Sequence, residues 1–235
     1  GYEYYTYDRI ADRGVPSFQG RPLATDASTF FGNAPASNSV ATVNSTFVAL
    51  EHKISDRATL RNRTSYGDYD KFYQNVFPGA VSANGATVSL SGYNNATQRR
   101  NLFNQTDLTV RRTGGRFEHT VLAGIELGRQ ETANLRTTAF FTTISATTTT
   151  VTVPVSAPTT SLPMEFRPNA TDADNHGVAT VAAVYAQDQV ALSRHVQAVV
   201  GLRYDSFNVD FRNQRLAADF QSHDGKVSPR LGVVY

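Results

Sequence analysis

The sequence lacks cysteine altogether, has no tryptophan and contains a single methionine. Without cysteine, the chain cannot form disulfides, thiolate-ligated zinc sites, iron–sulfur clusters or a thiol nucleophile. Charged residues make up only 18% of the 235 positions, below the roughly 25% of an average soluble domain. This deficit fits a protein with much of its surface turned away from bulk water.

Long hydrophobic runs are also missing. The most apolar stretch, 178–186, is about half the length that a membrane-spanning helix requires. The chain opens without the basic and apolar regions of a signal peptide, so a processed chain or an internal piece of a longer protein is expected. The net charge of +2 is too small, and the basic residues too dispersed, for nucleic-acid binding. Membrane helices are therefore excluded, whereas membrane strands are not.

The dominant pattern is an alternation of apolar and polar residues with the period of a β-strand. In segment 119–134, for example, Val121, Ile125 and Leu127 share one face and Glu126 lies on the other. Eight strands are predicted, near 1–8, 40–54, 58–73, 97–111, 117–135, 177–191, 196–211 and 225–235.

Short and long connections alternate between these strands. The short ones are 55–57, 112–116 and 192–195, and the long ones are 9–39, 74–96, 136–176 and 212–224. Outer-membrane barrels have this organisation, with short turns at one end and long loops at the other. Several strands also exceed the roughly 9–11 residues that cross a membrane, so they are expected to project beyond it.

The predicted fold is all-β, an antiparallel up-and-down transmembrane β-barrel segment. In that fold Glu126 and Arg203 face a wet lumen. Two alternatives remain open. A passive porin-like or small eight-stranded barrel would pair 1–8 with 225–235. A soluble β-sandwich or barrel that binds a ligand or partner would bury Leu127 in a dry core.

Three motifs carry a resemblance to a known family. They are residues 12–22 (DRGVPSFQGRP), residues 184–189 (VYAQDQ) followed by 201–205 (GLRYD), and residues 226–235 (KVSPRLGVVY). In this order and spacing they resemble TonB-dependent siderophore receptors of Gram-negative outer membranes. The resemblance extends over essentially the whole chain.

The resemblance implies that residues 1–235 are a barrel fragment. Receptors of this family have a plug domain and a barrel of about 22 strands, so the plug and the remaining strands are expected to be absent here. The implied function is uptake of a ferric siderophore across the cell outer membrane, energised through TonB. The implied partners are the ferric siderophore, outer-membrane lipid, and TonB by way of the missing plug. Iron would arrive already chelated, so no cofactor is expected.

Ligand contacts are implied for the external loops and the upper lumen. There, aromatic rings would stack on the chelate and arginines would pair with its oxygens. The candidate residues are Arg13, Phe18, Arg21, Tyr73, Phe77, Phe140 and Phe141. Alternatively, the first loop packs on itself, with Arg13 paired to Asp8 or Asp12. Tyr66 and Phe72 are better explained as part of an aromatic girdle at the membrane interface.

No catalytic or resident metal site is predicted. Residues 172–177 (DADNHG) resemble the start of a calcium-binding EF-hand loop, but position twelve of that loop is Ala183 instead of glutamate. The five histidines are scattered, and the sequence contains no nucleophile elbow, dinucleotide fingerprint or phosphate-binding loop. The protein is therefore not expected to be an enzyme.

Overall fold

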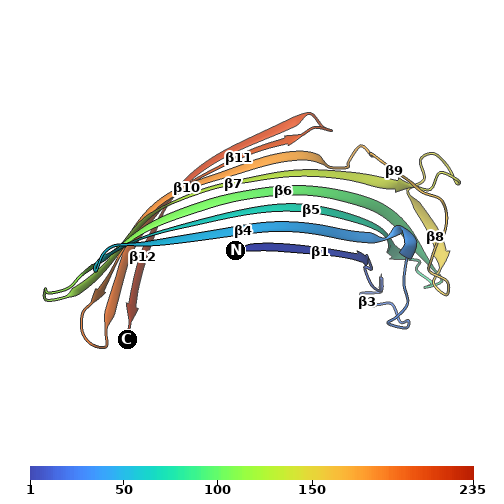
Figure 1. The fold of residues 1–235 in the computed structure, drawn as a ribbon. Helices are drawn as coiled ribbons and strands as arrows, with labels where there is room; N and C mark the ends of the chain where they lie inside the picture. Colours follow the sequence, from blue (N-terminus) through green and yellow to red (C-terminus); the bar gives the residue numbers. More distant parts are fainter.

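One antiparallel sheet dominates the computed structural model, which describes residues 1–235 (Figure 1). Its long strands are β1 (Tyr2–Ile10), β4 (Asn38–Ser55), β5 (Ala58–Val81), β6 (Thr87–Arg112), β7 (Glu118–Phe140), β10 (Asp174–Ala191), β11 (Gln197–Asn213) and β12 (Ala218–Val234). Strands that follow one another in this series are also neighbours in the sheet. The eight predicted strands and their up-and-down order are thus confirmed.

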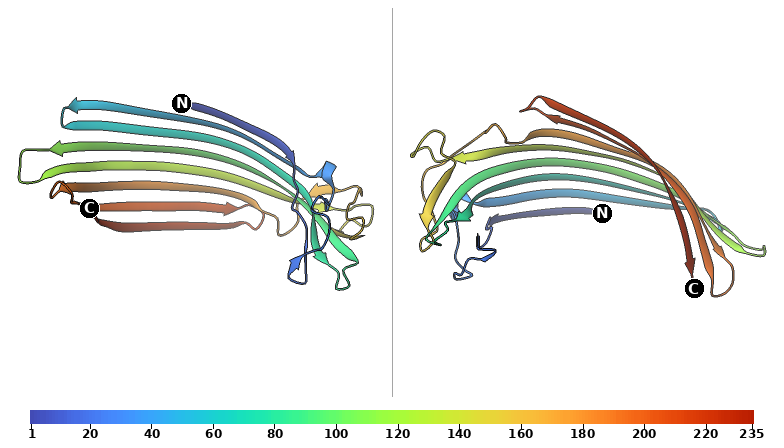
Figure 2. Two further views of the ribbon diagram at one scale, coloured as in Figure 1. Left: turned by 90° about the horizontal axis from the view of Figure 1, so that it is seen from below. Right: turned by 180° about the vertical axis from the view of Figure 1, so that it is seen from behind.

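The short elements gather at the looped end of the sheet (Figure 2). A small hairpin joins β2 (Ser17–Phe18) to β3 (Arg21–Pro22), and a 3-10 turn, η1 (Ala34–Ala36), precedes β4. β8 (Thr150–Pro154) pairs with β6, and β9 (Glu165–Arg167) pairs with β7. None of the helices is long and apolar enough to cross a membrane.

The sheet is open, because β1 and β12 form opposite edges and do not pair with each other (Figure 2). A closed eight-stranded barrel, which would join 1–8 to 225–235, is therefore excluded for this chain. The strands arch together along their length (Figure 1), which gives the sheet an inner, concave face and an outer, convex one.

Large apolar side chains lie on the outer face and remain exposed, because nothing packs over them. Pairing from β6 to β12 has no register shift, so one row contains Leu108, Ala123, Ala186, Leu202 and Pro229. Residues elsewhere on this face are also exposed to solvent in the isolated chain: Leu127 by 53%, Val200 by 54% and Leu231 by 80%. No second layer covers these residues, which contradicts the soluble sandwich.

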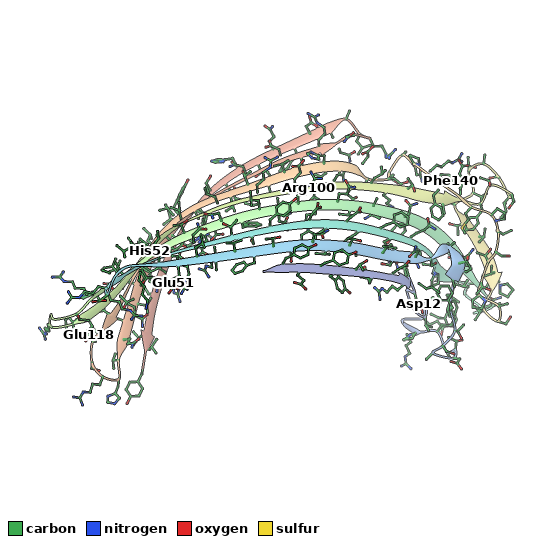
Figure 3. The ribbon with its side chains drawn as sticks, viewed as in Figure 1. Asp12, Glu51, His52, Arg100, Glu118 and Phe140 are labelled. Atoms are coloured by element: carbon green, nitrogen blue, oxygen red, sulfur yellow. The ribbon has the colours of Figure 1, made fainter.

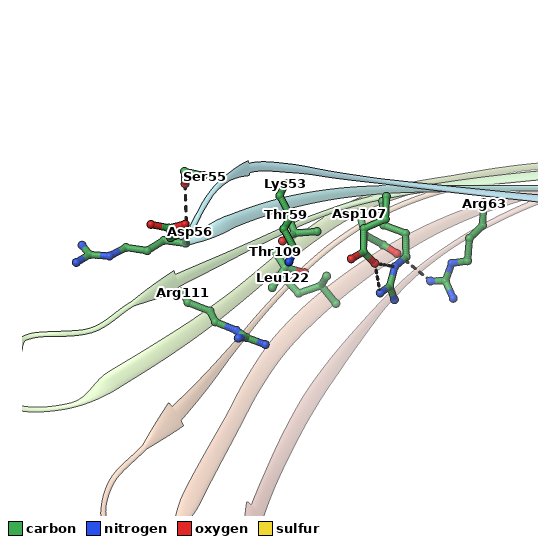
Figure 4. A pocket seen from close by; sticks show the side chains of 12 residues that line it. Lys53, Ser55, Asp56, Thr59, Arg63, Asp107, Thr109, Arg111 and Leu122 are labelled. Carbon is green, nitrogen blue, oxygen red and sulfur yellow. Dashed lines mark hydrogen bonds and ion pairs between the residues drawn. The ribbon is translucent and has the colours of Figure 1, made fainter.

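Polar and charged side chains occupy the inner face. Glu126 and Arg203 both lie there, with the guanidinium Nη1 donating to Glu126 Oε2 at 3.1 Å. Figure 4 shows Arg63 and Asp107 on the same underside of the sheet. The predicted division between an apolar outer face and a polar inner face is confirmed.

Two of the predicted long loops are wrong. Residues 74–96 continue β5 and β6 as a paired hairpin with a turn at 82–86, and residues 212–224 lie mostly in β11 and β12 with a turn at 214–217. Both segments are rich in polar residues, and 74–96 also contains three glycines, so neither shows a clear alternation of apolar and polar positions. Cross-strand hydrogen bonding nevertheless continues, because each strand already has a partner in register.

The only dry core lies at the looped end. Just 22 of 235 residues are buried, and they include two clusters around the β5–β6 hairpin. One cluster contains Val76, Leu90, Phe141 and Val151, and the other contains Leu23, Phe31 and Val88. The connections 11–37 and 141–173 therefore fold over the hairpin.

Gly32 joins these two connections to the sheet. Its N–H donates to Pro158 O at 3.0 Å, and its carbonyl accepts from Thr160 N at 2.9 Å. A Cβ at this position would lie 1.9 Å from Val76 O, and its φ of +135° disfavours other residues. Glycine is thus required where the two loops meet β5.

A closed polar cluster interrupts the outer apolar face. The Asn62 amide donates to Asn104 Oδ1 (3.2 Å) and Thr106 Oγ1 (2.8 Å), and the Asn104 amide donates to Asn62 Oδ1 (3.2 Å) and Thr64 Oγ1 (2.7 Å). The amide hydrogens of both asparagines are therefore satisfied within the cluster. This reciprocity makes two polar side chains tolerable on an apolar surface.

The cluster predicts a non-additive pair of substitutions. Asn104→Leu should lower the free energy of unfolding by about 1–3 kcal/mol, because the Asn62 amide loses both of its hydrogen bonds with the Asn104 side chain. Asn62→Leu combined with Asn104→Leu should return stability to within about 1 kcal/mol of the parent. Urea titration of the folded full-length barrel in phospholipid bilayers measures both values. A double variant that is as unstable as the sum of the single variants would contradict this account.

Candidate functional site

Towards the looped end, the inner face extends beyond the level at which the outer face is apolar. Aromatic and basic side chains meet there. Tyr73 and Phe77 come from β5, Tyr93 from β6 and Arg136 from β7. The pairings Asn75↔Tyr93 and Tyr93↔Thr138 place these residues on adjacent strands at similar heights. Figure 3 shows the looped end with Asp12 and Phe140, far from Glu51 and Glu118 at the short-turn end.

Tyr93 is the centre of this mouth cluster, which comprises Arg13, Tyr73, Phe77, Tyr93 and Arg136. Its ring centroid lies 5.7 Å from that of Tyr73 and 5.6 Å from that of Phe77. Arg136 Cζ is 4.0 Å from the Tyr93 centroid, and Arg13 Cζ is 4.4 Å from the Phe77 centroid. The Tyr73–Tyr93 pair is tilted and the Phe77–Tyr93 pair is edge-to-face, and two guanidinium groups are held by cation–π contacts around these rings.

The two arginines differ in charge pairing. Arg13 forms no ion pair with Asp8 or Asp12, and the Asp12 carboxylate instead accepts from Gly14 N at 2.8 Å. Arg136 Nε lies 3.2 Å from Asp172 Oδ1, but it is not aligned for a hydrogen bond, so the contact is ionic. Arg13 therefore offers the less compensated positive charge.

Asp172 ties several segments to the site. It is only 4% exposed. The Thr138 hydroxyl donates to its carboxylate, 2.9 Å from each oxygen, and Asn169 N donates to Oδ2 at 2.8 Å. Arg215 Nε donates to its backbone carbonyl at 2.8 Å. Through Asp172, the connection 141–173 and the β11–β12 turn are fixed to β7 beside Arg136.

Burial affects the ionisation of the cluster. Tyr73 lies nearer the looped end of β5 than Tyr66, where the apolar part of the outer face ends on this strand. Desolvation, followed by the neighbouring Tyr93, raises the pKa of the Tyr73 phenol, and Arg13 and Arg9 oppose this rise. The phenol is therefore held protonated and can donate a hydrogen bond.

The structure separates the seven residues expected to contact a ligand. Arg13, Tyr73 and Phe77 are together in the mouth cluster. Arg21 is exposed on the β2–β3 hairpin, and the Phe18 ring packs against the cluster of Leu23, Phe31 and Val88.

Phe140 and Phe141 are buried instead of lining the lumen. Phe140 is 8% exposed, and Arg167 covers its ring with Cζ 4.1 Å from the centroid. Phe141 is fully buried with Val76, Leu90 and Val151. Both side chains are part of the buried core beneath the connection 141–173.

Tyr93 and Arg136 were missed by sequence reasoning. The strands were expected near 97–111 and 117–135, so both residues fell into supposed loops. The sequence does contain a signal for both residues. Tyr93 is two positions from Asn95, and Arg136 is two positions from Asn134, so each faces the same inner side of its strand.

The run 172–177 does not gather into a metal site. The Asp172 carboxylate is engaged by Thr138, Asn169 and Arg136, and His176 Nε2 lies 2.9 Å from Glu131 Oε1 on the outer face. No group of three or more His, Asp or Glu side chains with metal-binding geometry occurs in the chain.

A second network lies deeper on the inner face. The Tyr185 hydroxyl donates to Asp107, Gln105 Nε2 donates to that hydroxyl at 2.7 Å, and Arg63 Nη2 lies 2.8 Å from Asp107. The Tyr185 ring reaches across β7 above Gly124, where a Cβ would lie 2.5 Å from the ring. This network rigidifies the inner wall below the mouth cluster.

Comparison with known proteins identifies the fold. A family model described as TonB dependent receptor-like, beta-barrel matches residues 1–235. The chain belongs to this family. No curated protein matches it significantly in sequence.

Solved receptors for siderophores and ferric chelates have a similar fold. The siderophore receptor PiuA from Acinetobacter baumannii is 19% identical with a TM-score of 0.82, over 99% of this chain and 36% of that one. The ferric-catecholate import receptor Fiu from E. coli K12, in its closed form, is 18% identical with a TM-score of 0.71, over 99% and 37%. The ferric preacinetobactin receptor BauA from A. baumannii is 10% identical with a TM-score of 0.64, over 99% and 34%. This chain spans about a third of each.

The role of Asp172 can be tested by local exchange. Asp172→Ala removes the acceptor of Asn169 N–H, so amides in 165–173 should exchange with deuterium about tenfold faster. Asp26→Ala is the matched control, because the exposed Asp26 carboxylate accepts only from the nearby Ser28. Exchange in 165–173 that matches the parent would show that Asp172 does not fix this connection.

Proposed function

We propose that this chain forms part of the barrel of an outer-membrane receptor of a Gram-negative bacterium that imports ferric siderophores. The observation that carries the proposal is the mouth cluster, in which Arg13 and Arg136 flank aromatic rings in tilted and edge-to-face contact at the looped end of a polar inner face. Family membership and the named roles of PiuA, Fiu and BauA support the same function.

The cluster fits the chemistry of a ferric chelate. Its rings can stack on the flat faces of catecholate or similar groups, and its guanidiniums can pair with chelate oxygens. The iron is cargo, held by its chelator, and the barrel residues bind it without making or breaking covalent bonds. No protein-bound cofactor is required.

The remaining parts of the receptor would complete the transport path. The open edges at β1 and β12 would pair with further strands, and the outer apolar face would contact outer-membrane lipid. A plug domain outside this chain would close the lumen and receive energy through TonB. The same polar inner face would then act as the wall along which the ligand passes. Nucleic acid is not expected as a partner, since the net charge is only +2.

The proposal predicts that the mouth cluster sets affinity for anionic chelates. Arg13→Gln combined with Arg136→Gln in the full-length receptor should weaken binding of a ferric tris-catecholate anion by about tenfold to a hundredfold, because two charge-assisted contacts are lost. Binding of radiolabelled iron chelate to de-energised cells measures the dissociation constant.

Two comparisons make this experiment decisive. Arg116→Gln with Arg194→Gln removes the same charge at the opposite end and should leave affinity unchanged. Arg21→Gln tests whether the exposed β2–β3 hairpin also contributes. Wild-type affinity in the Arg13/Arg136 double variant would remove the mouth cluster from ligand binding.

A further inference from the structure

A charged hollow lies on the inner face at the short-turn end, opposite the mouth cluster (Figure 4). It measures about 500 Å³ and is formed mainly by β4, β5, β6 and the β4–β5 turn. Lys53 faces it from beside its pairing partner Thr59, and Arg111 N donates to Arg57 O at 2.7 Å. Lys53, Arg57 and Arg111 all line this hollow at one end of the inner wall.

None of these three cations forms an ion pair, although the Asp56 carboxylate also lines the hollow. The hollow is lined by five basic and three acidic residues, which leaves a charge of +2. Arg61 pairs with Glu51 at 2.5 Å, and Arg63 pairs with Asp107 at 2.8 Å. Lys53, Arg57 and Arg111 have no carboxylate within 4.0 Å. The uncompensated charge is thus concentrated at the end farthest from the mouth.

The lining favours a small, hydrated anion over a docked polypeptide. A volume of about 500 Å³ lies within the range of small-molecule sites. Protein interfaces have an apolar centre, but Leu122 is the single apolar residue here. Charge without apolar contact gives weak, salt-sensitive binding. Weak binding suits a transport path, since a passenger must be attracted and then released.

We propose that Lys53, Arg57 and Arg111 form a low-affinity anion station on the inner wall. The station takes carboxylate or catecholate oxygens of an anionic chelate that has left the mouth cluster, and holds them until release at the short-turn end. This assignment rests on the proposed uptake function and adds a second binding site to its path.

The site is tested first by equilibrium binding, which does not require transport. Citrate is titrated calorimetrically into the purified full-length receptor carrying Arg13→Gln and Arg136→Gln, so that the mouth cluster does not contribute. Weak binding that falls with added salt is expected. Adding Lys53→Gln, Arg57→Gln and Arg111→Gln should abolish it. Adding Arg112→Gln, Arg116→Gln and Arg194→Gln, which removes the same charge at the same end outside the hollow, should not.

The path is tested second by uptake. In the otherwise unaltered receptor, the Lys53/Arg57/Arg111 triple variant should import a ferric tris-catecholate anion about tenfold more slowly, with its binding to de-energised cells unchanged. Import of an uncharged ferric trihydroxamate should not change. Equal amounts of folded receptor in the membrane are verified for every variant.

Each outcome decides one part of the account. Citrate binding that persists in the triple variant, or unchanged import of the anion, overturns the station. Equal loss of import for the charged and uncharged chelates also overturns it, and points to a polypeptide held by these cations. If the station binds citrate but the parent receptor imports neither chelate, the proposed uptake function fails while the anion site stands.

Discussion

The structure depends on one constraint: in a single-layered sheet, every side chain must face one of two environments, and strands with a neighbour on each side pair their backbone amides in both directions. Water is an unfavourable environment for the outer face, because its exposed leucines, valines and isoleucines would each gain about 1.5–3 kcal/mol on leaving water. The proposed hydrocarbon surround would satisfy that face, and strand pairing would leave no amide or carbonyl unbonded in lipid once further strands cover the edges at β1 and β12. The reciprocal Asn62–Asn104 cluster obeys the same rule for side chains.

The same alternation also builds the candidate site. Where β5, β6 and β7 extend beyond the apolar band, the inner-face positions pass from charged residues to Tyr73, Tyr93 and Arg136 without any change in strand pairing. The two long connections then cover the β5–β6 hairpin with a small dry core, fixed by Gly32 and Asp172. The strand scaffold therefore presents the rings and the Arg136 guanidinium, and the connection 11–37 places the Arg13 guanidinium against them.

Much of this arrangement was predictable from the sequence. Periodicity, together with the β-branched content of 40–54 and 178–191, placed the eight strands and both faces correctly. Glu126 and Leu127, for example, lie on opposite faces of β7. Periodicity failed for 74–96, since pairing between strands extends polar, glycine-rich segments that no local signal marks. For that reason Tyr93 was missed, whereas Arg136 was missed because the strand predicted to end near 135 continues to Phe140. The burial of Phe140 and Phe141 could not be predicted either. It depends on which connection covers the β5–β6 hairpin, and composition does not encode that long-range contact.

The central claim is that the outer apolar face contacts lipid and the inner face contacts water. Residues 1–235 contain no cysteine. Single spin labels can therefore be introduced as Leu127→Cys, Val200→Cys and Ser228→Cys in the full-length receptor in bilayers, after any cysteine outside these residues has been replaced by serine. Labels at 127 and 200 should collide with membrane-dissolved oxygen and be shielded from a water-soluble nickel chelate, whereas the label at 228, on the inner face, should show the reverse. Equal accessibility of 127 and 228 to the nickel chelate would contradict the account.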